Sequence, residues 1–233
     1  MTRVRALVMG RSAAVVVAVV GQRLAPAGPP LICWEIEIGD AKSLPWEHGT
    51  FGRKEDYDVA RLVSDTLAIL TPDTPVLVRM ETLRRATIYA TPNGDGGPKG
   101  RAAAWELVAR LFARALDGET RGTPDGLAWF DAGYLVGACG QGGVETGFDG
   151  YAYALRGRSL VPASPELEFA LALMRAMGDP KVMYPAHQAH LAAALAGARD
   201  GSLLAKNLLT HLGQGAKTLD EMRAAQGKKK AGE

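Results

Sequence analysis

The sequence has few cysteines, few aromatic residues and no excess of charge of one sign. Its 2 cysteines among 233 residues form no Cys-x-x-Cys motif, which excludes a disulfide framework, a cysteine-only metal cluster, thioredoxin-like redox chemistry and covalently attached haem. The 27 basic and 25 acidic residues are spread along the chain, and the one dense basic run is the lysine triplet at 228–230. Because binding to phosphates needs a concentrated basic face, we expect no nucleic-acid partner.

What the sequence does contain is typical of a single globular domain. Hydrophobic residues make up 47% and charged residues 22% of the chain, which excludes global disorder and a protein with several membrane spans. A length of 233 residues suffices for one sizeable core and does not favour two domains.

Residues 1–27 have the order of basic, apolar and small residues that is typical of a bacterial secretory signal. Three arginines precede or flank the start of the apolar run 12–21, and Ala25 and Ala27 have the spacing of a cleavage site. The run is shorter than the roughly 20 residues of a stable membrane span. We therefore predict cleavage before Gly28 and a periplasmic or extracellular protein.

The alternative is that the N-terminal residues stay in the fold of a cytoplasmic protein. Residues 4–8, 14–20 and 31–38 are rich enough in β-branched and apolar side chains to form three strands, the first two as a hairpin. Export would bring Cys33 and Cys139 into a compartment where they can pair, whereas in the cytoplasm they stay free thiols.

The rest of the chain predicts a mainly α-helical fold with an extended N-terminal segment at 28–53, a helical domain at 54–213 and a weakly ordered tail at 214–233. The helices would form an irregular bundle or a short stack of helical hairpins. Apolar residues recur at helical spacing between polar, glycine-rich or proline-rich breaks, of which the loop 93–100 is the clearest. Helices are predicted over about 55–70, 75–90, 101–117, 124–139, 147–156, 165–177, 185–196 and 202–212.

One stretch, 129–162, resembles a single tetratricopeptide unit. Trp129, Gly133, Tyr134 and a further glycine at 137 lie in its first helix, and a proline closes the second helix. Small residues at 133 and 137 would let the paired helix approach closely. One unit without further copies is equally typical of an irregular bundle.

Three motifs resemble a set of exported bacterial proteins of unknown function. They are Ile38 to Trp46 (IGDAKSLPW), Thr74 to Arg85 (TPVLVRMETLRR) and Leu127 to Leu135 (LAWFDAGYL). The resemblance implies a cleaved signal and brings no catalytic role with it.

Two histidines are candidate metal ligands. His187 and His190 are three residues apart on a predicted helix, and two imidazoles at that spacing can bind one metal ion when a third ligand joins them. His48, His211 or a carboxylate could be that ligand. The competing interpretation is a structural role, since no His-Glu-x-x-His motif surrounds the pair.

Two charged groups are candidate sites for a ligand or a partner. Arg79 and Arg84, with Glu81 between them, could clamp an acidic ligand, although solvated ion pairs such as Glu81 with Arg85 are the commoner arrangement. The loop with Asp40, Lys42, Ser43 and Trp46 combines polar groups with a tryptophan and could form a cleft. Its alternative role is to cap a turn and to fix the N-terminal segment onto the helices by Pro45 and Trp46.

These observations predict an exported helical interaction or scaffold protein with a protein partner and no cofactor. The absence of a recognisable catalytic arrangement favours a protein that is not an enzyme. The alternative is a periplasmic hydrolase or ligand-binding enzyme that uses the loop 40–46, with or without a metal ion.

Overall fold

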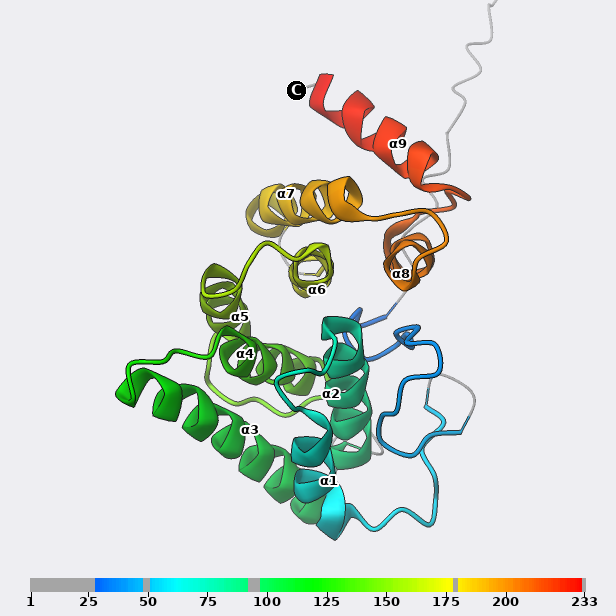
Figure 1. Cartoon of the computed structure of the whole chain (residues 1–233). Helices are drawn as coiled ribbons and strands as arrows, with labels where there is room; N and C mark the ends of the chain where they lie inside the picture. Colours follow the sequence, from blue (N-terminus) through cyan, green and yellow to red (C-terminus); the bar gives the residue numbers. More distant parts are fainter. Residues whose placement is uncertain (1–27, 48–50, 92–96, 178–179, 232–233) are drawn as a thin grey trace, which may run out of the picture.

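The described part of the chain, residues 28–47, 51–91, 97–177 and 180–231 of a computed structural model, is mainly helical and contains no β-strand. The predicted signal peptide, and with it the alternative hairpin, lies outside the described residues. Figure 1 shows α1 and α3 at one end of the stack, α2 and α4 next to them, and α9 at the other end. The elements are η1 (Val59–Arg61), α1 (Leu62–Ile69), α2 (Val76–Ala90), α3 (Gly97–Thr120), α4 (Gly126–Gln141), α5 (Gly150–Ser159), α6 (Pro165–Met174), α7 (Pro180–Gly197), α8 (Leu203–Leu212) and α9 (Leu219–Ala231).

Short polar side chains set where four of these helices begin. The side chains of Asp125, Asp149, Ser164 and Ser202 each accept a hydrogen bond from the backbone N–H three residues on, at the start of α4, α5, α6 and α8. Such caps satisfy backbone donors that have no partner inside the helix. The mainly helical fold predicted from the sequence is therefore confirmed.

Several predicted boundaries are wrong. The helix predicted over 55–70 begins later, because residues 55–58 precede η1 and are not helical. Residues 97–100 belong to α3 and not to a loop, and α7 begins before Pro185, which lies inside it.

The C-terminal residues form a helix where the sequence predicts a weakly ordered tail. Leu219 and Met222 of α9 are buried in the hydrophobic core. Arg223 donates hydrogen bonds to the Leu195 and Ala198 carbonyl oxygens at the end of α7, at 3.1 and 3.0 Å. These contacts come from distant residues, so local propensity does not reveal them.

Helices α4 and α5 approach each other closely enough for their backbones to be in contact. A Cβ atom added at Gly133 would lie 2.5 Å from the Gly150 carbonyl oxygen, and one at Gly157 would lie 2.5 Å from the Gly126 carbonyl oxygen. Gly126 in α4 thus faces Gly157 in α5, whereas Gly133, later in α4, faces Gly150, earlier in α5. The two helices are therefore antiparallel. The predicted role of Gly133 is confirmed, whereas Gly137 faces the side chains of Met174 and Leu31.

Residues 28–47 cross α2 and reach α8 without regular secondary structure (Figure 1). Ile32, Ile36 and Ile38 are buried, and the residues between them are more exposed. The backbone N–H groups of this segment bond to side chains of the bundle: Leu31 to Gln141, Ile36 to Glu81 and Glu37 to Asn207, at 2.7, 2.9 and 2.8 Å. The segment thus ties together α2, α4 and α8. Among the described helices, none is long and apolar enough to cross a membrane.

Candidate functional site

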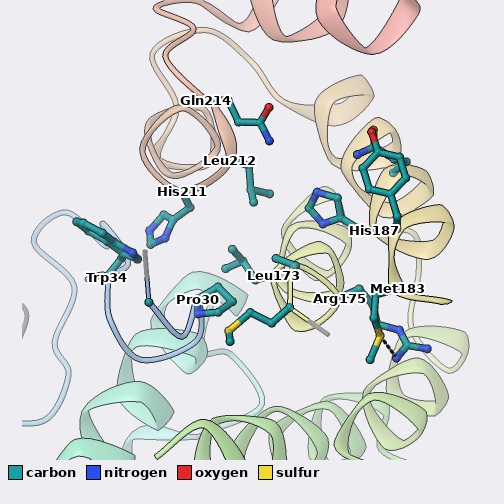
Figure 2. A pocket seen from close by; sticks show the side chains of 14 residues that line it. Pro30, Trp34, Leu173, Arg175, Met183, His187, His211, Leu212 and Gln214 are labelled. Carbon is teal, nitrogen blue, oxygen red and sulfur yellow. Dashed lines mark hydrogen bonds between the residues drawn. The ribbon is translucent and has the colours of Figure 1, made fainter. Parts of the chain in front are cut away.

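A cavity of about 360 Å³ lies between the N-terminal segment, the end of α6, the first half of α7 and the end of α8. Its volume is within the range of small-molecule sites. Figure 2 shows Trp34 and His211 side by side on one flank and Arg175 beside Met183 on the other, with Pro30 and Leu173 between them. The other lining residues are Gly28, Ala176, Met177, Tyr184, His187, Gln188, Leu212 and Gln214.

The local sequence explains how three helices present these side chains. Helix α6 ends at Met174, so Arg175 follows at its C-cap. In α7, Tyr184, His187 and Gln188 have the three- and four-residue spacing that places them on one face. His211 lies in the last turn of α8, next to Leu212.

Four buried polar atoms around this cavity have no hydrogen-bond partner within the described residues. They are Trp34 Nε1, Arg175 Nε, Gln188 Oε1 and His211 Nδ1, and the other two such atoms, Asp131 Oδ1 and Tyr134 Oη, lie elsewhere. A buried polar atom without a partner costs about 1–3 kcal/mol, so native proteins contain few of them. Their concentration around one cavity makes it the candidate site for a polar ligand.

The geometry of His211 fixes its hydrogen-bonding state. Its Nε2 lies 3.1 Å from the Glu35 carbonyl oxygen, which can only accept, so Nε2 carries a proton. Burial lowers the pKa of His211 to about 4, although the hydrogen bond to the Glu35 carbonyl group favours the charged form and raises the pKa. At neutral pH the ring is therefore neutral, and Nδ1 offers a lone pair to the cavity.

Arg175 is held by a chain of contacts through three helices. Its guanidinium lies over the ring of Tyr151, 3.9 Å from the ring centroid, and its Nη1 contacts Met183 Sδ at 2.7 Å. The Tyr151 hydroxyl bonds to His190 Nε2 at 2.8 Å, and His190 Nδ1 bonds to Glu168 at 2.6 Å. Since no carboxylate among the described residues pairs with Arg175, its charge is available to a ligand.

Two other cavities lack this character. One of about 540 Å³ lies beside Cys33, Arg53 and Gln141, but none of the unpartnered buried atoms lines it. One of about 300 Å³ adjoins the first cavity under α9 and shares Gln188, Leu212 and Gln214 with it. The first cavity is therefore the candidate site.

The residues of the predicted loop site line none of the three cavities described above. Asp40 and Lys42 are exposed, whereas the Ser43 hydroxyl bonds to that of Thr82 at 2.9 Å. The Trp46 ring lies under the guanidinium of Arg84, 4.9 Å away, and its Nε1 donates to Glu35 at 2.7 Å. These contacts agree with the structural alternative, in which the loop fastens the N-terminal segment to α2.

Arg79 and Arg84 are buried inside the bundle and do not form the predicted clamp. Arg79 pairs with Asp131 at 2.5 Å, both side chains being fully buried, and donates to the carbonyl oxygens of Thr71 and Thr74. Burial raises the pKa of Asp131, while the charge of Arg79 opposes that rise.

Arg84 is held by Glu81. Its Nε and Nη2 donate to the two Glu81 carboxylate oxygens at 2.7 and 2.8 Å, and Arg85 joins the same carboxylate at 2.6 Å. The predicted pair of Glu81 with Arg85 does form, but the two side chains are 0% and 16% exposed, so it is a largely buried ion pair and not a solvated one. The network has a structural role between α2 and the N-terminal segment.

His187 and His190 do not converge on a metal site. His187 Nδ1 bonds to the Ala172 carbonyl oxygen at 2.8 Å, and both ring nitrogens of His190 are engaged by Glu168 and Tyr151. Within the described ranges no three His, Cys, Asp or Glu side chains are placed to hold a metal ion, and His48 lies outside them. Both cysteines are free thiols, Cys139 being buried.

Sequence reasoning missed most of the cavity. The sequence predicts His187 and His211 only as metal ligands and Trp34 only as one residue of the possible strand 31–38. It predicts no role for Arg175 or Gln188. These residues lie far apart in the sequence, and no spacing rule connects them. The one signal in the sequence is Trp34, a large aromatic residue within the largely apolar stretch 31–38.

No protein-family model, no curated protein and no solved structure matches this chain.

Proposed function

We propose that this chain is a binding protein for a small organic molecule, held in the cavity between the N-terminal segment, α6, α7 and α8. The observation that carries the proposal is the group of four buried polar atoms without protein partners around that cavity. A ligand with its own donors and acceptors would satisfy them, and its apolar part would contact the proline, leucine and methionine side chains.

Binding and not catalysis is proposed because the groups that line the cavity include no nucleophile with an adjacent base. The cavity contains neither serine nor cysteine, and the neutral His211 ring is fixed by the Glu35 carbonyl group rather than by a carboxylate. The sequence-based alternative places ligand binding at the loop 40–46. The present proposal keeps ligand binding but places it in the cavity.

A cavity-blocking substitution tests the proposal. Ala176 lines the cavity and is exposed, so Ala176→Trp can cover the opening at little cost to folding. We expect small aromatic and aliphatic compounds with polar groups to bind the unmodified chain in saturation-transfer NMR, to compete with one another, and to lose at least about tenfold in affinity in the variant.

The matched control is Ala152→Trp, at an exposed alanine on α5 that does not line the cavity. Binding should survive this change. Binding that responds equally to both substitutions, or no binding by any compound, would contradict the proposal.

The alternative proposal is the exported interaction module predicted from the sequence. The observation that favours it is a stripe of apolar side chains along α3: Trp105, Phe112 and Leu116 share one face, and Phe148 lies 5.2 Å from the Phe112 ring. Trp105, Leu116 and Phe148 are 43%, 53% and 47% exposed. Exposed apolar surface of this kind is typical of contacts between proteins.

The stripe predicts a partner that depends on it. A protein that crosslinks to the chain in cell envelopes should, once identified and purified, bind the unmodified chain and lose at least about tenfold in affinity for Leu116→Lys. Undiminished binding by this variant would exclude the stripe as the interface. Asp200→Lys, at an exposed residue between α7 and α8 that is not part of the stripe, is the control.

A further inference from the structure

We infer that the ligand of the cavity is a small carboxylate with an apolar body and a hydroxyl group at the end remote from the carboxylate. This inference rests on the proposed binding function and specifies the ligand's chemistry. Three features support it: the charge of the lining, the contacts of Arg175, and the donor and acceptor on the opposite flank.

The lining has a positive charge and no negative one. Among its fourteen described residues, Arg175 is the one arginine or lysine, and neither aspartate nor glutamate is present. A guanidinium beside a largely apolar cavity favours an anion there, since little water screens the interaction. A cationic ligand would meet Arg175 without any compensating carboxylate.

Arg175 is positioned as an anion-binding group and not as a structural ion pair. Two of its contacts, the Tyr151 ring and the Met183 sulfur, are weak partners for a cation and leave Nε without an acceptor. The bonds from Tyr151 to His190 and from His190 to Glu168 hold the ring on which the guanidinium rests. A planar carboxylate fits a guanidinium fixed in this way.

The opposite flank presents one donor and one acceptor next to each other. Trp34 Nε1–H is a donor without an acceptor, and His211 Nδ1 is an acceptor without a donor. The two rings lie side by side across the cavity from Arg175 (Figure 2). A hydroxyl group can accept from Trp34 and donate to His211 at once, which neither a carboxylate nor a methyl group can do.

Between the two flanks the cavity is lined by apolar side chains, which suit the apolar body of the ligand. Pro30, Leu173 and Leu212 are among the lining residues there, and Gln188 Oε1 offers one further acceptor. The combination excludes sugars, which have polar groups all round, and long acyl chains, which a volume of about 360 Å³ would not enclose.

Matched small molecules test the inference on the full, unmodified chain. The carboxylates are 4-hydroxybenzoate, 4-hydroxyphenylacetate and 3-(4-hydroxyphenyl)propionate, which cover a range of lengths. Each is compared by calorimetry with its neutral primary amide and with the analogue that lacks the hydroxyl. We expect at least one acid to bind about 10- to 100-fold more tightly than its amide, and several-fold more tightly than the dehydroxylated acid.

Two variants assign the groups. Arg175→Gln should remove the preference for the acid over the amide. Trp34→Phe removes the N–H donor but leaves an aromatic side chain, and it should remove the preference for the hydroxyl group. Arg121→Gln, at an exposed residue outside the lining, is the control. Since the acid-to-amide ratio is measured on the unmodified chain, the inference stays testable even where a variant fails to fold.

The outcomes separate this inference from the proposed function. Amides that bind as well as the acids, with binding blocked by Ala176→Trp, would leave the binding function standing and overturn the carboxylate assignment. Equal affinities with and without the hydroxyl would overturn the assignment of the Trp34 and His211 flank. If no compound of either charge binds, the binding function itself fails, and this inference fails with it.

Discussion

Glu81→Gln is expected to lower the free energy of unfolding by about 3–5 kcal/mol, because the substitution leaves a fully buried guanidinium without its counter-charge. Glu81 accepts two hydrogen bonds from Arg84, one from Arg85 and one from the Ile36 backbone N–H. A glutamine is of nearly the same size, so the loss reports charge and hydrogen bonding and not a cavity. Urea unfolding followed by circular dichroism measures it.

The matched control for this prediction is Glu106→Gln. Glu106 also pairs with an arginine four residues on, Arg110 at 3.6 Å, but the two side chains are 55% and 64% exposed. Exposed pairs of this kind contribute at most about 1 kcal/mol. Equal effects of the two substitutions would show that burial does not determine the importance of the Glu81 network.

Gly133→Ala is expected to destabilise the protein by at least about 2 kcal/mol, since the added Cβ would overlap backbone atoms of α5. The backbone cannot rotate away as a side chain can, so α4 and α5 would have to separate. That separation would weaken the packing of α5 and reduce the midpoint temperature of unfolding in calorimetry.

Helix α4 also contains a glycine, Gly140, at which an added methyl group should stabilise the protein. A Cβ added at Gly140 would meet nothing within 4 Å, and the residue is exposed near the end of α4. Gly140→Ala should therefore stabilise the protein by about 0.5–1 kcal/mol, through the reduced freedom of the unfolded chain. A Gly133→Ala variant as stable as Gly140→Ala would contradict the close α4–α5 approach.

The parts of the fold that local rules govern could be predicted from the sequence. Ser164 and Ser202 begin their helices where capping chemistry places them, and Gly133 lies where two helices approach closely. The parts set by distant contacts could not be predicted. Helix α9 depends on apolar residues buried against the core and on Arg223 at the end of α7, and its own sequence is rich in lysine.

The candidate site differs from the sequence-based prediction for a related reason. Arg79 and Arg84 are residues of the kind that binds an acidic ligand, but each forms a buried ion pair inside the protein, with Asp131 and Glu81 respectively. Only the packing of α2 against its neighbours reveals these pairs. Arg175 looks unremarkable in the sequence and becomes a candidate because its surroundings lack a carboxylate. What matters is which charges remain unpaired after folding, and spacing along the chain does not report that.

The position of Gly28 would link the predicted removal of a leader to the chemistry of the cavity. Gly28 is one of the lining residues, and it is also the residue before which the sequence predicts cleavage. Removal of the leader at that bond would create an α-ammonium group, ordinarily with a pKa near 8, at the rim of the cavity. Proteolytic processing would then add a second positive charge to a site that already has Arg175, so that the mature chain would hold an anion more tightly than its precursor.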